Sequence, residues 1–499
     1  MNRDSELVLG LVHTVGTNCS DAIECIIDGL NRFSYNTVVI KVSQEIIKQF
    51  IKDGMTEPDG SNEYNRISFY MDLGNDIRSK SKDNAILMKG VAAYIYRNFR
   101  EENGGGPITR QAYIIDSIKH PEEVDFLRKT YGDGFHLIGI TDEYAKRKHF
   151  LTSRKRMTET DAIRILDRDD NEKERNGQHT SDVYQQSDYF VNAGDSKETT
   201  QENIYRLLDL LFGNAFVSPT FEEYAMFRAY VASLRSADLS RQIGAVVANP
   251  DAQEIIAEGV NDCPHAFGGV YWPTTDSKGR IRDVPLGRDY TLGYDSNKKE
   301  QQKIIKQILQ NLNLAEDDSN YEKIKASGIG TLTEYGRVVH SEMEALMMCA
   351  RNNISTRGCT MYVTTFPCHN CAKHIIAAGI RRVVYIEPYP KSKALEFYKN
   401  EISQQDSDFE TKVIFTPFKG VGPHKFIDLF SMKSTRCYSR IRKDKNGDVI
   451  KWDETQASLR NPMALYNYID MEKAAFKQYA EETNAKEETT GIRKDKENE

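Results

Sequence analysis

The sequence lacks three features that would place it among membrane, secreted or nucleic-acid-binding proteins. No run reaches the ~18 consecutive apolar residues that a transmembrane helix needs. The first residues, Met1 to Glu6, are polar and lack the basic-then-apolar plan of a signal peptide. A basic excess is also missing, because 67 Lys and Arg face 74 Asp and Glu, for a net charge of −7. We therefore expect a cytoplasmic protein with no membrane association and no stable DNA binding.

Cysteine is sparse as well, and its spacing is informative. Eight cysteines in 499 residues exclude a disulfide scaffold. Six are scattered along the chain, as is typical of small buried hydrophobic residues. Cys368 and Cys371 stand three residues apart, and such a close pair indicates a metal or redox site.

Strand-like and helix-like segments alternate along most of the chain, which predicts an α/β fold with two domains. A first parallel-sheet block, 1–212, has strand candidates at 7–12, 38–40, 112–116, 136–140 and 189–192. A second block, 220–432, has them at 244–249, 255–259, 360–365, 383–386 and 413–415.

Two further segments are distinguished by their composition. Residues 433–499 form a C-terminal extension, charged and expected to be disordered from about 481. Residues 268–297 are rich in Gly, Asp and Pro and predict a long loop, a kind of segment that is usually functional or disordered. Two functions for this loop remain open, namely holding the substrate or holding an allosteric nucleotide.

The strongest chemical signal lies in residues 340–371. His340 and Glu342 are followed by Pro367, Cys368 and Cys371, in the H-x-E…P-C-x-x-C order that is the signature of zinc nucleobase deaminases. Two cysteines three apart at a helix start share one face, and the positive helix end favours thiolates. With His340 they provide three ligands for one Zn²⁺ ion, which leaves a fourth position open for water, as in catalytic sites.

Glu342 is predicted to be the catalytic residue. It converges on the metal site only if His340 lies at the very start of its helix, because residues two apart on a regular helix point apart. Zinc lowers the pKa of a bound water toward ~7, and a neighbouring carboxylate can move its proton to the leaving ammonia. The predicted reaction is hydrolytic deamination of a pyrimidine. The alternatives are a structural zinc knuckle and a chance C-x-x-C pair.

Two further segments, 235–247 and 258–264, resemble deoxycytidylate deaminases, and with the zinc motif the resemblance covers most of 220–432. It implies a cytidine deaminase-like three-layer α/β/α domain and makes Asn261 a candidate for contact with the substrate. Arg241 lies in the first of these segments. After the strand at 383–386, Tyr389 can stack on a base and Lys391 can meet a phosphate, although a solvent-facing loop is the alternative. The predicted substrate-binding residues are Asn261, Arg241, Tyr389 and Lys391.

The N-terminal block resembles a P-loop kinase, with a strand, a glycine turn and a helix. The P-loop pattern is G-x-x-x-x-G-K-[ST]. With Gly16 as its second glycine, Leu11 takes the place of the first and Thr17 that of the lysine, so the residue that neutralises a transferred phosphate is missing. We therefore prefer regulatory nucleotide sensing or partner binding to phosphoryl transfer, with a plain scaffold as the alternative. The candidate residues are Gly10, Gly16, Thr17, Asn18 and Asp116, the last at the end of a strand as in a Walker B motif.

As a whole, the chain resembles the anti-phage dCTP deaminase family. That resemblance implies deamination of dCTP or dCMP to the uracil nucleotide and ammonia, depleting dCTP during infection. It also implies a homo-oligomer, such as the hexamer of deoxycytidylate deaminases. A regulatory nucleotide, a protein inhibitor and an RNA inhibitor all remain open as partners. The competing functions are a housekeeping dCMP deaminase for thymidylate synthesis, a polynucleotide cytidine deaminase and a non-enzymatic regulator with a structural zinc ion.

Overall fold

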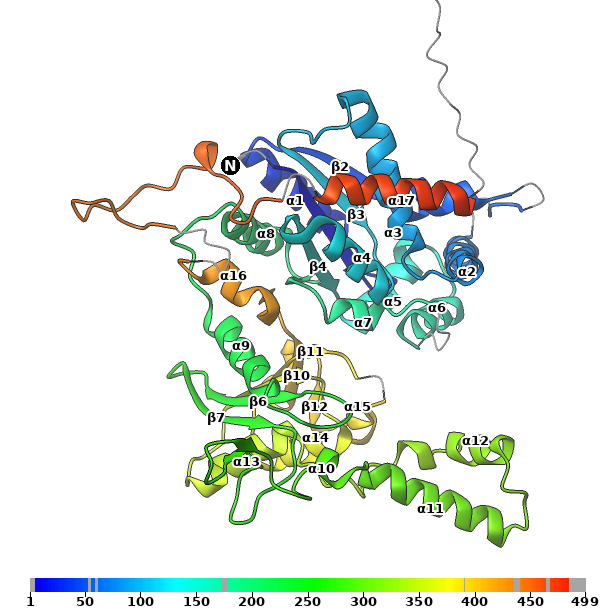
Figure 1. The fold of residues 1–499 in the computed structure, drawn as a ribbon, viewed down its shortest axis with the longest axis vertical. Coiled ribbons are helices and arrows are strands. Elements are labelled where there is room, and N and C mark those ends of the chain that lie inside the picture. Colours follow the sequence, from blue (N-terminus) through cyan, green and yellow to red (C-terminus); the bar gives the residue numbers. More distant parts are fainter. Residues whose placement is uncertain are drawn as a thin grey trace, which may run out of the picture. The chain divides into compact units, whose positions relative to one another are not determined.

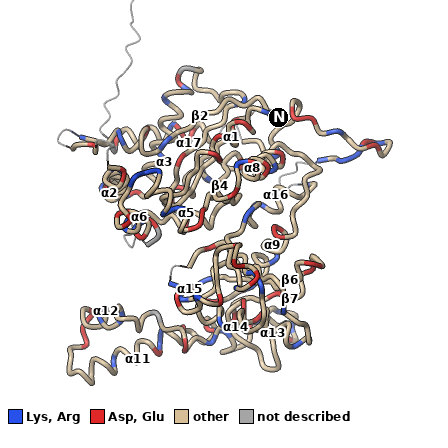
Figure 2. The backbone as a smooth tube through the Cα atoms, turned by 180° about the vertical axis from the view of Figure 1, so that it is seen from behind, with Lys and Arg blue, Asp and Glu red and all other residues tan. Residues whose placement is uncertain are grey.

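The computed structural model describes residues 5–52, 55–58, 62–171, 177–389, 391–433, 440–463 and 467–483. These residues form two compact units (Figure 1). Unit 1 comprises residues up to Pro219 together with those from Lys419 onward, and unit 2 comprises Thr220–Phe418. Basic and acidic residues are interspersed along both units (Figure 2). Across the described ranges, no helix has both the length and the apolar character required to traverse a bilayer.

Unit 1 is built on a six-stranded sheet in the order β14-β5-β4-β1-β3-β2. All neighbouring pairs are parallel except β14 with β5. The strands are β1 (Leu7–His13), β2 (Asn36–Lys41), β3 (Gln111–Asp116), β4 (Phe135–Thr141), β5 (Tyr189–Asn192) and β14 (Gly420–Val421). The predicted parallel α/β sheet is therefore confirmed, and its five expected strands correspond to β1 to β5.

Six consecutive residues of β1 are buried, which indicates that both faces of this sheet are covered, as helices cover the faces of parallel sheets. On one face, Leu7, Leu9 and Leu11 of β1 belong to a core shared with α1 and α8. A second group of helices, α3, α4 and α17, packs together. The helices of unit 1 are α1 (Ser20–Arg32), α2 (Glu63–Ser81), α3 (Ile86–Ile95), α4 (Pro121–Tyr131), α5 (Tyr144–His149), α6 (Glu159–Asn171), α7 (Thr180–Tyr184), α8 (Lys197–Leu211), α16 (Phe426–Phe430) and α17 (Asn467–Thr483).

The C-terminal segment belongs to unit 1, so unit 2 ends at Phe418, earlier than the expected boundary at 432. Three interactions explain this difference. The short strand β14 pairs with β5, the Lys419 ammonium group binds the Asp195 carboxylate at 2.8 Å, and α17 packs against α3. The disorder expected from about 481 onward falls mainly on residues 484–499, which lie outside the described residues.

Unit 2 is a three-layer α/β/α structure, as predicted. Its sheet has the order β12-β13-β11-β10-β6-β7, parallel from β12 to β10 and antiparallel at β6 and β7. The strands are β6 (Gly244–Asn249), β7 (Glu254–Val260), β10 (Thr360–Thr365), β11 (Arg382–Glu387), β12 (Ile402–Ser403) and β13 (Val413–Pro417).

Two helices of unit 2 pack on one face of the sheet and present the zinc motif. Alternate residues of β6 and β10, such as Val247 and Met361, share a core with α13 (Ser341–Arg351) and α14 (His369–Ala377). The helix α9 (Phe221–Ser233) contacts β6, β7 and β10, and its Phe221 packs edge-on against Tyr362. Further helices are α10 (Asp289–Leu292), α11 (Ser296–Asn311), α12 (Asp318–Ala326) and α15 (Ala394–Phe397).

The segment 268–297, expected to be a long loop, contains little regular structure. It holds the two-residue strands β8 (Thr274–Thr275) and β9 (Ile281–Arg282), the short helix α10 and the start of α11. Figure 1 shows α11 and α12 as a helical hairpin that follows this segment.

Candidate metal centre and active site

The three predicted zinc ligands converge in unit 2. His340 is the N-cap of α13, Cys368 is the N-cap of α14 and Cys371 lies in the first turn of α14. The Nδ1 atom of His340 lies 3.5 Å from the Cys368 sulfur and 3.4 Å from the Cys371 sulfur, and all three ligand atoms fall within 4.8 Å of one another. Zinc bonds of about 2.0–2.3 Å in a tetrahedral arrangement separate ligand atoms by roughly 3.5 Å, so this donor set fits one zinc ion.

The electrostatics of the cluster also suit a metal. Hydrogen bonding to Cys371, together with contact with His340, lowers the pKa of Cys368 to about 3 against the opposing effect of burial. The same hydrogen bond and burial raise the pKa of Cys371. Hydrogen bonding to Cys368 raises the pKa of His340 to about 9. A thiolate is therefore held beside two groups that release protons when a metal binds.

Glu342 lies where the motif requires it. Because His340 is the N-cap, with φ −69° and ψ 150°, it stands outside the helical turn and Glu342 occupies the first turn. The Glu342 side chain is buried, and one carboxylate oxygen accepts a hydrogen bond of 3.1 Å from the Ser341 hydroxyl. Burial raises the pKa of Glu342, which favours a group that alternates between carboxylate and acid.

A second group of side chains lies beside the metal cluster, around the carboxyl end of β11. The Arg241 guanidinium donates to the Glu387 carboxylate at 2.7 Å, and Thr365 donates to the other oxygen of that carboxylate at 2.9 Å. The guanidinium carbon of Arg241 is 5.7 Å from the centroid of the half-buried Tyr389 ring. Burial raises the pKa of Tyr389, with a smaller contribution from the charge of Cys368. Tyr389 and Cys368 pack against the same apolar core.

The other two predicted substrate-binding residues are Asn261, which is buried, and Lys391, which is exposed. The buried Asn261 amide accepts from the Ile243 backbone N–H at 2.7 Å and donates to the Arg241 carbonyl oxygen at 2.8 Å. It therefore fixes the backbone that carries Arg241, and an amide retains one hydrogen and one lone pair for another partner.

Sequence reasoning missed Glu387, which holds Arg241. The signal was present, because β10 and β11 are parallel and their carboxyl ends meet at one edge of the sheet. The zinc cysteines follow β10, so an acidic residue ending the neighbouring strand belongs to the same region.

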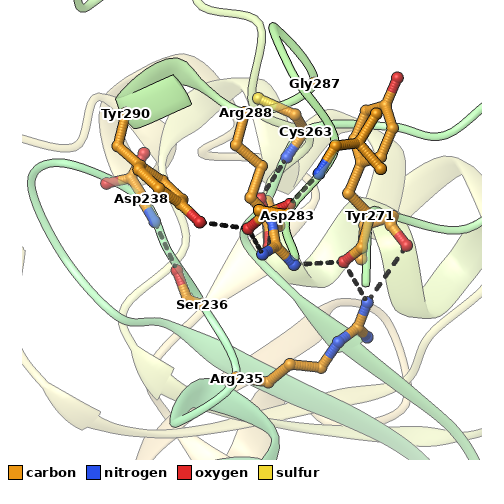
Figure 3. A network of polar contacts seen from close by, with 12 residues as sticks. Arg235, Ser236, Asp238, Cys263, Tyr271, Asp283, Gly287, Arg288 and Tyr290 are labelled. Atoms are coloured by element: carbon orange, nitrogen blue, oxygen red, sulfur yellow. Dashed lines mark hydrogen bonds and ion pairs between the residues drawn. The ribbon is translucent and has the colours of Figure 1, made fainter. Parts of the chain in front are cut away.

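The loop after β7 is organised around one buried arginine (Figure 3). Arg288 is only 4% exposed. Its Nε atom lies 3.1 Å from an Asp262 carboxylate oxygen, and its Nη1 atom donates to the Asp283 carboxylate at 2.6 Å. Arg288 also donates to the carbonyl oxygen of Tyr271, and Tyr290 donates to Asp283. A buried charge with this many partners gives an otherwise irregular segment a defined shape.

A separate cavity of about 610 Å³ lies between α9, β7, α13 and this loop. Arg235 and Arg351 line it with Glu344, and the Arg235 guanidinium carbon stacks 3.6 Å from the centroid of Trp272. Neither the metal cluster nor Glu342 is among its lining residues.

The candidate nucleotide-binding residues of unit 1 are only partly brought together. Gly10 lies inside β1, where a Cβ atom would meet Ile118 at 2.5 Å, so its small size serves packing. Gly16, at φ +83°, lies in the following loop with a backbone conformation that favours glycine. The buried Thr17 hydroxyl lies 3.1 Å from that of Thr14.

The remaining two candidates serve local contacts. The Asn18 side chain accepts from the Ser20 backbone N–H at 3.3 Å. Asp116, at the end of β3, binds the His13 ring at 2.9 Å. None of these contacts requires a nucleotide.

Residues 219–387 match the family model of the cytidine and deoxycytidylate deaminase zinc-binding region. The chain is 49% identical over 55 residues to the deoxycytidylate deaminase of enterobacteria phage T4, which is 11% of this chain and 28% of that protein. It is 46% identical over 54 residues to the human deoxycytidylate deaminase, which is 11% of this chain and 29% of that protein. Each match thus spans less than a third of the relative.

Among solved structures, the dCMP deaminase of cyanophage S-TIM5 in complex with dCMP and dUMP aligns with 18% identity and a TM-score of 0.23. The alignment covers 41% of this chain and all of that one. Residues 219–387 thus resemble the zinc-binding region of cytidine and deoxycytidylate deaminases, and they contain the His–Cys–Cys cluster.

Proposed function

We propose that unit 2 catalyses zinc-dependent hydrolytic deamination of deoxycytidine nucleotides, converting dCMP or dCTP into the uracil nucleotide and ammonia. The observation that carries the proposal is the placement of Glu342 in the first turn of the helix whose N-cap, His340, joins Cys368 and Cys371. Three protein ligands leave one tetrahedral position open, which distinguishes a catalytic site from a closed structural one.

Each residue of the site has a defined task in this reaction. When bound, zinc supplies an activated water by lowering its pKa toward ~7. His340, Cys368 and Cys371 hold the ion. Glu342 takes one proton from the attacking water and delivers it to the pyrimidine ring nitrogen; it then moves the proton of the hydroxyl added to the ring carbon to the amino group, which departs as ammonia. Ser341 donates to the Glu342 carboxylate and so orients it.

Substrate recognition is assigned to the group around the end of β11. Arg241 carries a charge suited to a nucleotide phosphate, and Glu387 and Tyr389 hold its side chain at the edge of the site. Tyr389 offers a ring face for the base, and Asn261 positions the Arg241 backbone. Lys391, exposed on the following loop, is assigned a second phosphate contact.

For the whole chain, we propose depletion of dCTP as an anti-phage defence, carried out by a homo-oligomer. Unit 1, with its degenerate P-loop-like strand–turn–helix, serves as a regulatory domain that senses a nucleotide or binds a protein or RNA inhibitor. A housekeeping dCMP deaminase is the second candidate, and the similarity to deoxycytidylate deaminases of phage and human origin favours it. The additional α/β unit favours the defence role, because a simple pathway enzyme does not require it.

One assay separates these activities. Purified full-length protein is incubated with dCMP, dCTP, CTP and a cytosine-containing oligonucleotide, and ammonia and uracil products are followed. Turnover of a free deoxycytidine nucleotide that is lost in Glu342→Gln supports the proposal. Activity confined to the oligonucleotide would mean a polynucleotide deaminase instead, and no turnover by the zinc-loaded protein contradicts the enzymatic assignment.

The defence role needs a cellular test. Bacteria carrying the wild-type or the Glu342→Gln protein are infected with phage, and dCTP pools and plaque numbers are measured. A fall in dCTP and in plaques only with the wild-type protein supports dCTP depletion. Unchanged dCTP pools during infection, with active dCMP turnover in vitro, support the housekeeping function.

A further inference from the structure

The proposed metal ligand His340 stands on irregular backbone. As the N-cap of α13 it has an extended conformation, with φ −69° and ψ 150°, and its side chain does not cap the helix. The preceding residues, 332–339, form a turn and a single bridge residue instead of a helix or a strand. A ligand on such a segment keeps its direction only if other parts of the chain hold the segment, because a functional site tolerates displacements of only about 0.5 Å.

Two attachments hold the segment that leads to this ligand. Val339 donates its backbone N–H to the Asp262 carbonyl oxygen at 3.0 Å, and the Asp262 N–H donates to the Val339 carbonyl oxygen at 3.3 Å, which makes an antiparallel bridge. The Arg337 guanidinium donates to the Asp289 carboxylate at 3.0 Å and to the Gly287 carbonyl oxygen at 2.8 Å. Both attachments lead to the irregular segment that follows β7.

Arg288 connects these two attachments. Its Nε atom lies 3.1 Å from an Asp262 carboxylate oxygen, and its neighbours in the chain are the two residues that Arg337 binds. Its other donors reach the Asp283 carboxylate at 2.6 Å and the Tyr271 carbonyl oxygen (Figure 3). The side chains of Arg288 and Asp262 are only 4% and 2% exposed, so water competes little for these contacts.

An arginine suits this position better than a lysine. The guanidinium is a planar fork whose donors point in fixed directions, whereas an ammonium group is a compact point charge. A buried ion pair contributes little net stability, because the loss of hydration offsets the attraction, but it can select one arrangement of the chain. The arrangement found here places Asp262 opposite Val339, the residue that precedes His340.

We propose that Arg288 is a positioning residue of the metal centre. By holding the Asp262 carboxylate it fixes the bridge to Val339 and, through that bridge, the position of His340 relative to the two zinc cysteines. In this role Arg288 is neither a metal ligand nor a substrate contact. The inference rests on the zinc site of the proposed function and extends that site to a segment outside the deaminase motif. Residues that act through a metal ligand typically change metal affinity or activity about 10- to 100-fold.

The competing explanation is that Arg288 only stabilises the loop around it. Loss of that role lowers the thermal stability of a variant but leaves the metal ligands of the folded protein as they are. Loss of a positioning role changes the geometry and the affinity of the site in a protein that is still folded. A readout at the metal therefore distinguishes the two explanations, and it requires no turnover.

The test compares Arg288→Lys with Arg280→Lys in the full chain. Lysine retains the positive charge but cannot hold the Asp262 carboxylate and the Tyr271 carbonyl oxygen together. Arg280, the control, is an exposed residue of the same segment that binds Asp276 at 2.8 Å. We expect the zinc dissociation constant, measured by competition with a chromophoric chelator, to rise about tenfold in Arg288→Lys. The value for Arg280→Lys should equal that of the wild-type protein.

The ligand geometry is measured in parallel on the cobalt-substituted proteins, whose visible absorption spectrum depends on the arrangement of the ligands. We expect the absorption bands of Arg288→Lys to shift and those of Arg280→Lys to match the wild-type protein. A thermal unfolding scan shows which variants are folded. A folded Arg288→Lys protein with wild-type zinc affinity and a wild-type cobalt spectrum would overturn the inference.

Asp262→Asn tests whether Arg288 acts through Asp262. This change removes the charge that Arg288 holds, and we expect the same weakening of zinc binding and the same shift of the cobalt bands. The double variant should bind zinc no more weakly than the weaker of the two single variants, because both changes break one contact. Effects that add in the double variant contradict the proposed route. If Arg288→Lys does not fold, a wild-type cobalt spectrum in Asp262→Asn refutes the inference by itself.

The result for the proposed function is read separately. If the wild-type protein binds zinc and the variants bind it equally well, only the positioning role of Arg288 is refuted. A wild-type protein that binds no zinc contradicts the proposed deaminase site, and this inference with it.

Discussion

The Nδ1 atom of His340 lies 3.4 Å from the sulfur of Cys371, although 31 residues separate them in the chain. Packing between α13 and α14 brings them together, since Ala345 of the first helix and Ile375 of the second share one apolar core. The donor atoms are thus positioned by the core of unit 2, and the site is preorganised for a metal ion.

We expect Cys371→Ser to lose zinc, because a serine hydroxyl at neutral pH does not replace a thiolate ligand. The affinity is expected to fall by at least about two orders of magnitude. The zinc content of the protein after dialysis against a chelator measures this loss of affinity. Cys349→Ser is the matched control, because Cys349 is fully buried in the same core without touching the cluster. If Cys371→Ser keeps zinc as tightly as Cys349→Ser does, Cys371 is not a ligand.

Glu342→Gln is expected to keep its zinc and lose turnover. The amide is nearly isosteric with the carboxylate but cannot carry a proton, and removal of a general base typically costs about 10²–10⁴-fold in rate. Steady-state deamination of dCMP and dCTP, with zinc content measured in parallel, checks this. Glu344→Gln, two residues further along α13 and paired with Arg351 at 2.7 Å, is the control and should retain its rate. Full activity in Glu342→Gln contradicts the general-base role.

Local signals in the sequence were sufficient for much of this architecture. The apolar runs at 7–12 and 112–116 predicted buried strands because parallel strands covered on both faces are continuously apolar. The spacing of His340 and Glu342 required the histidine to begin its helix, and the structure places it as the N-cap. Such inferences succeed because each depends on residues a few positions apart.

Long-range contacts were not predictable in the same way. The return of the chain to unit 1 depends on pairs such as Arg100 with Glu472, which are 372 residues apart and both fully buried. Neither residue has a neighbour in the sequence that indicates its partner. For the Arg241–Glu387 pair, the strand arrangement indicated an acidic residue at this edge of the sheet, but nothing in the sequence indicated Arg241, 146 residues away, as its partner.

Arg241→Ala is expected to weaken nucleotide binding selectively. Loss of one phosphate contact raises KM about tenfold, equivalent to about 1.4 kcal/mol. The KM for the nucleoside deoxycytidine, which has no phosphate, should not change. Arg381→Ala is the control. Arg381 immediately precedes β11, at the end of that strand opposite to Glu387, and it pairs with Glu410. Equal rises in KM for dCMP and deoxycytidine would indicate that Arg241 supports the site only structurally.

The stability of unit 1 is expected to depend on a buried cluster around Arg100. The Arg100 guanidinium binds both oxygens of Glu6 at 3.0 Å and a Glu472 oxygen at 2.9 Å. Arg100→Met leaves two carboxyl groups without their cation, and breaking such a buried pair costs about 3–5 kcal/mol. Denaturant unfolding measures this loss. Lys80→Met, which removes an exposed partner of Asp76, should cost less than about 0.5 kcal/mol.

The same cluster predicts how the stability of unit 1 varies with pH. Burial, partly offset by Arg100, raises the pKa of Glu472 from its ordinary 4.5 to about 7. The folded state therefore binds this proton more tightly than the unfolded state does. The resulting stabilisation is complete below about pH 4.5 and is lost as the pH rises through about 7. Glu472→Gln stays neutral, so the free energy of unfolding of this variant should vary less with pH over this range. Asp76→Asn changes an exposed site and should leave the pH dependence as in the wild-type protein. If the free energy of unfolding of Glu472→Gln and of the wild-type protein declines in parallel between pH 5 and 8, the pH dependence comes from other groups.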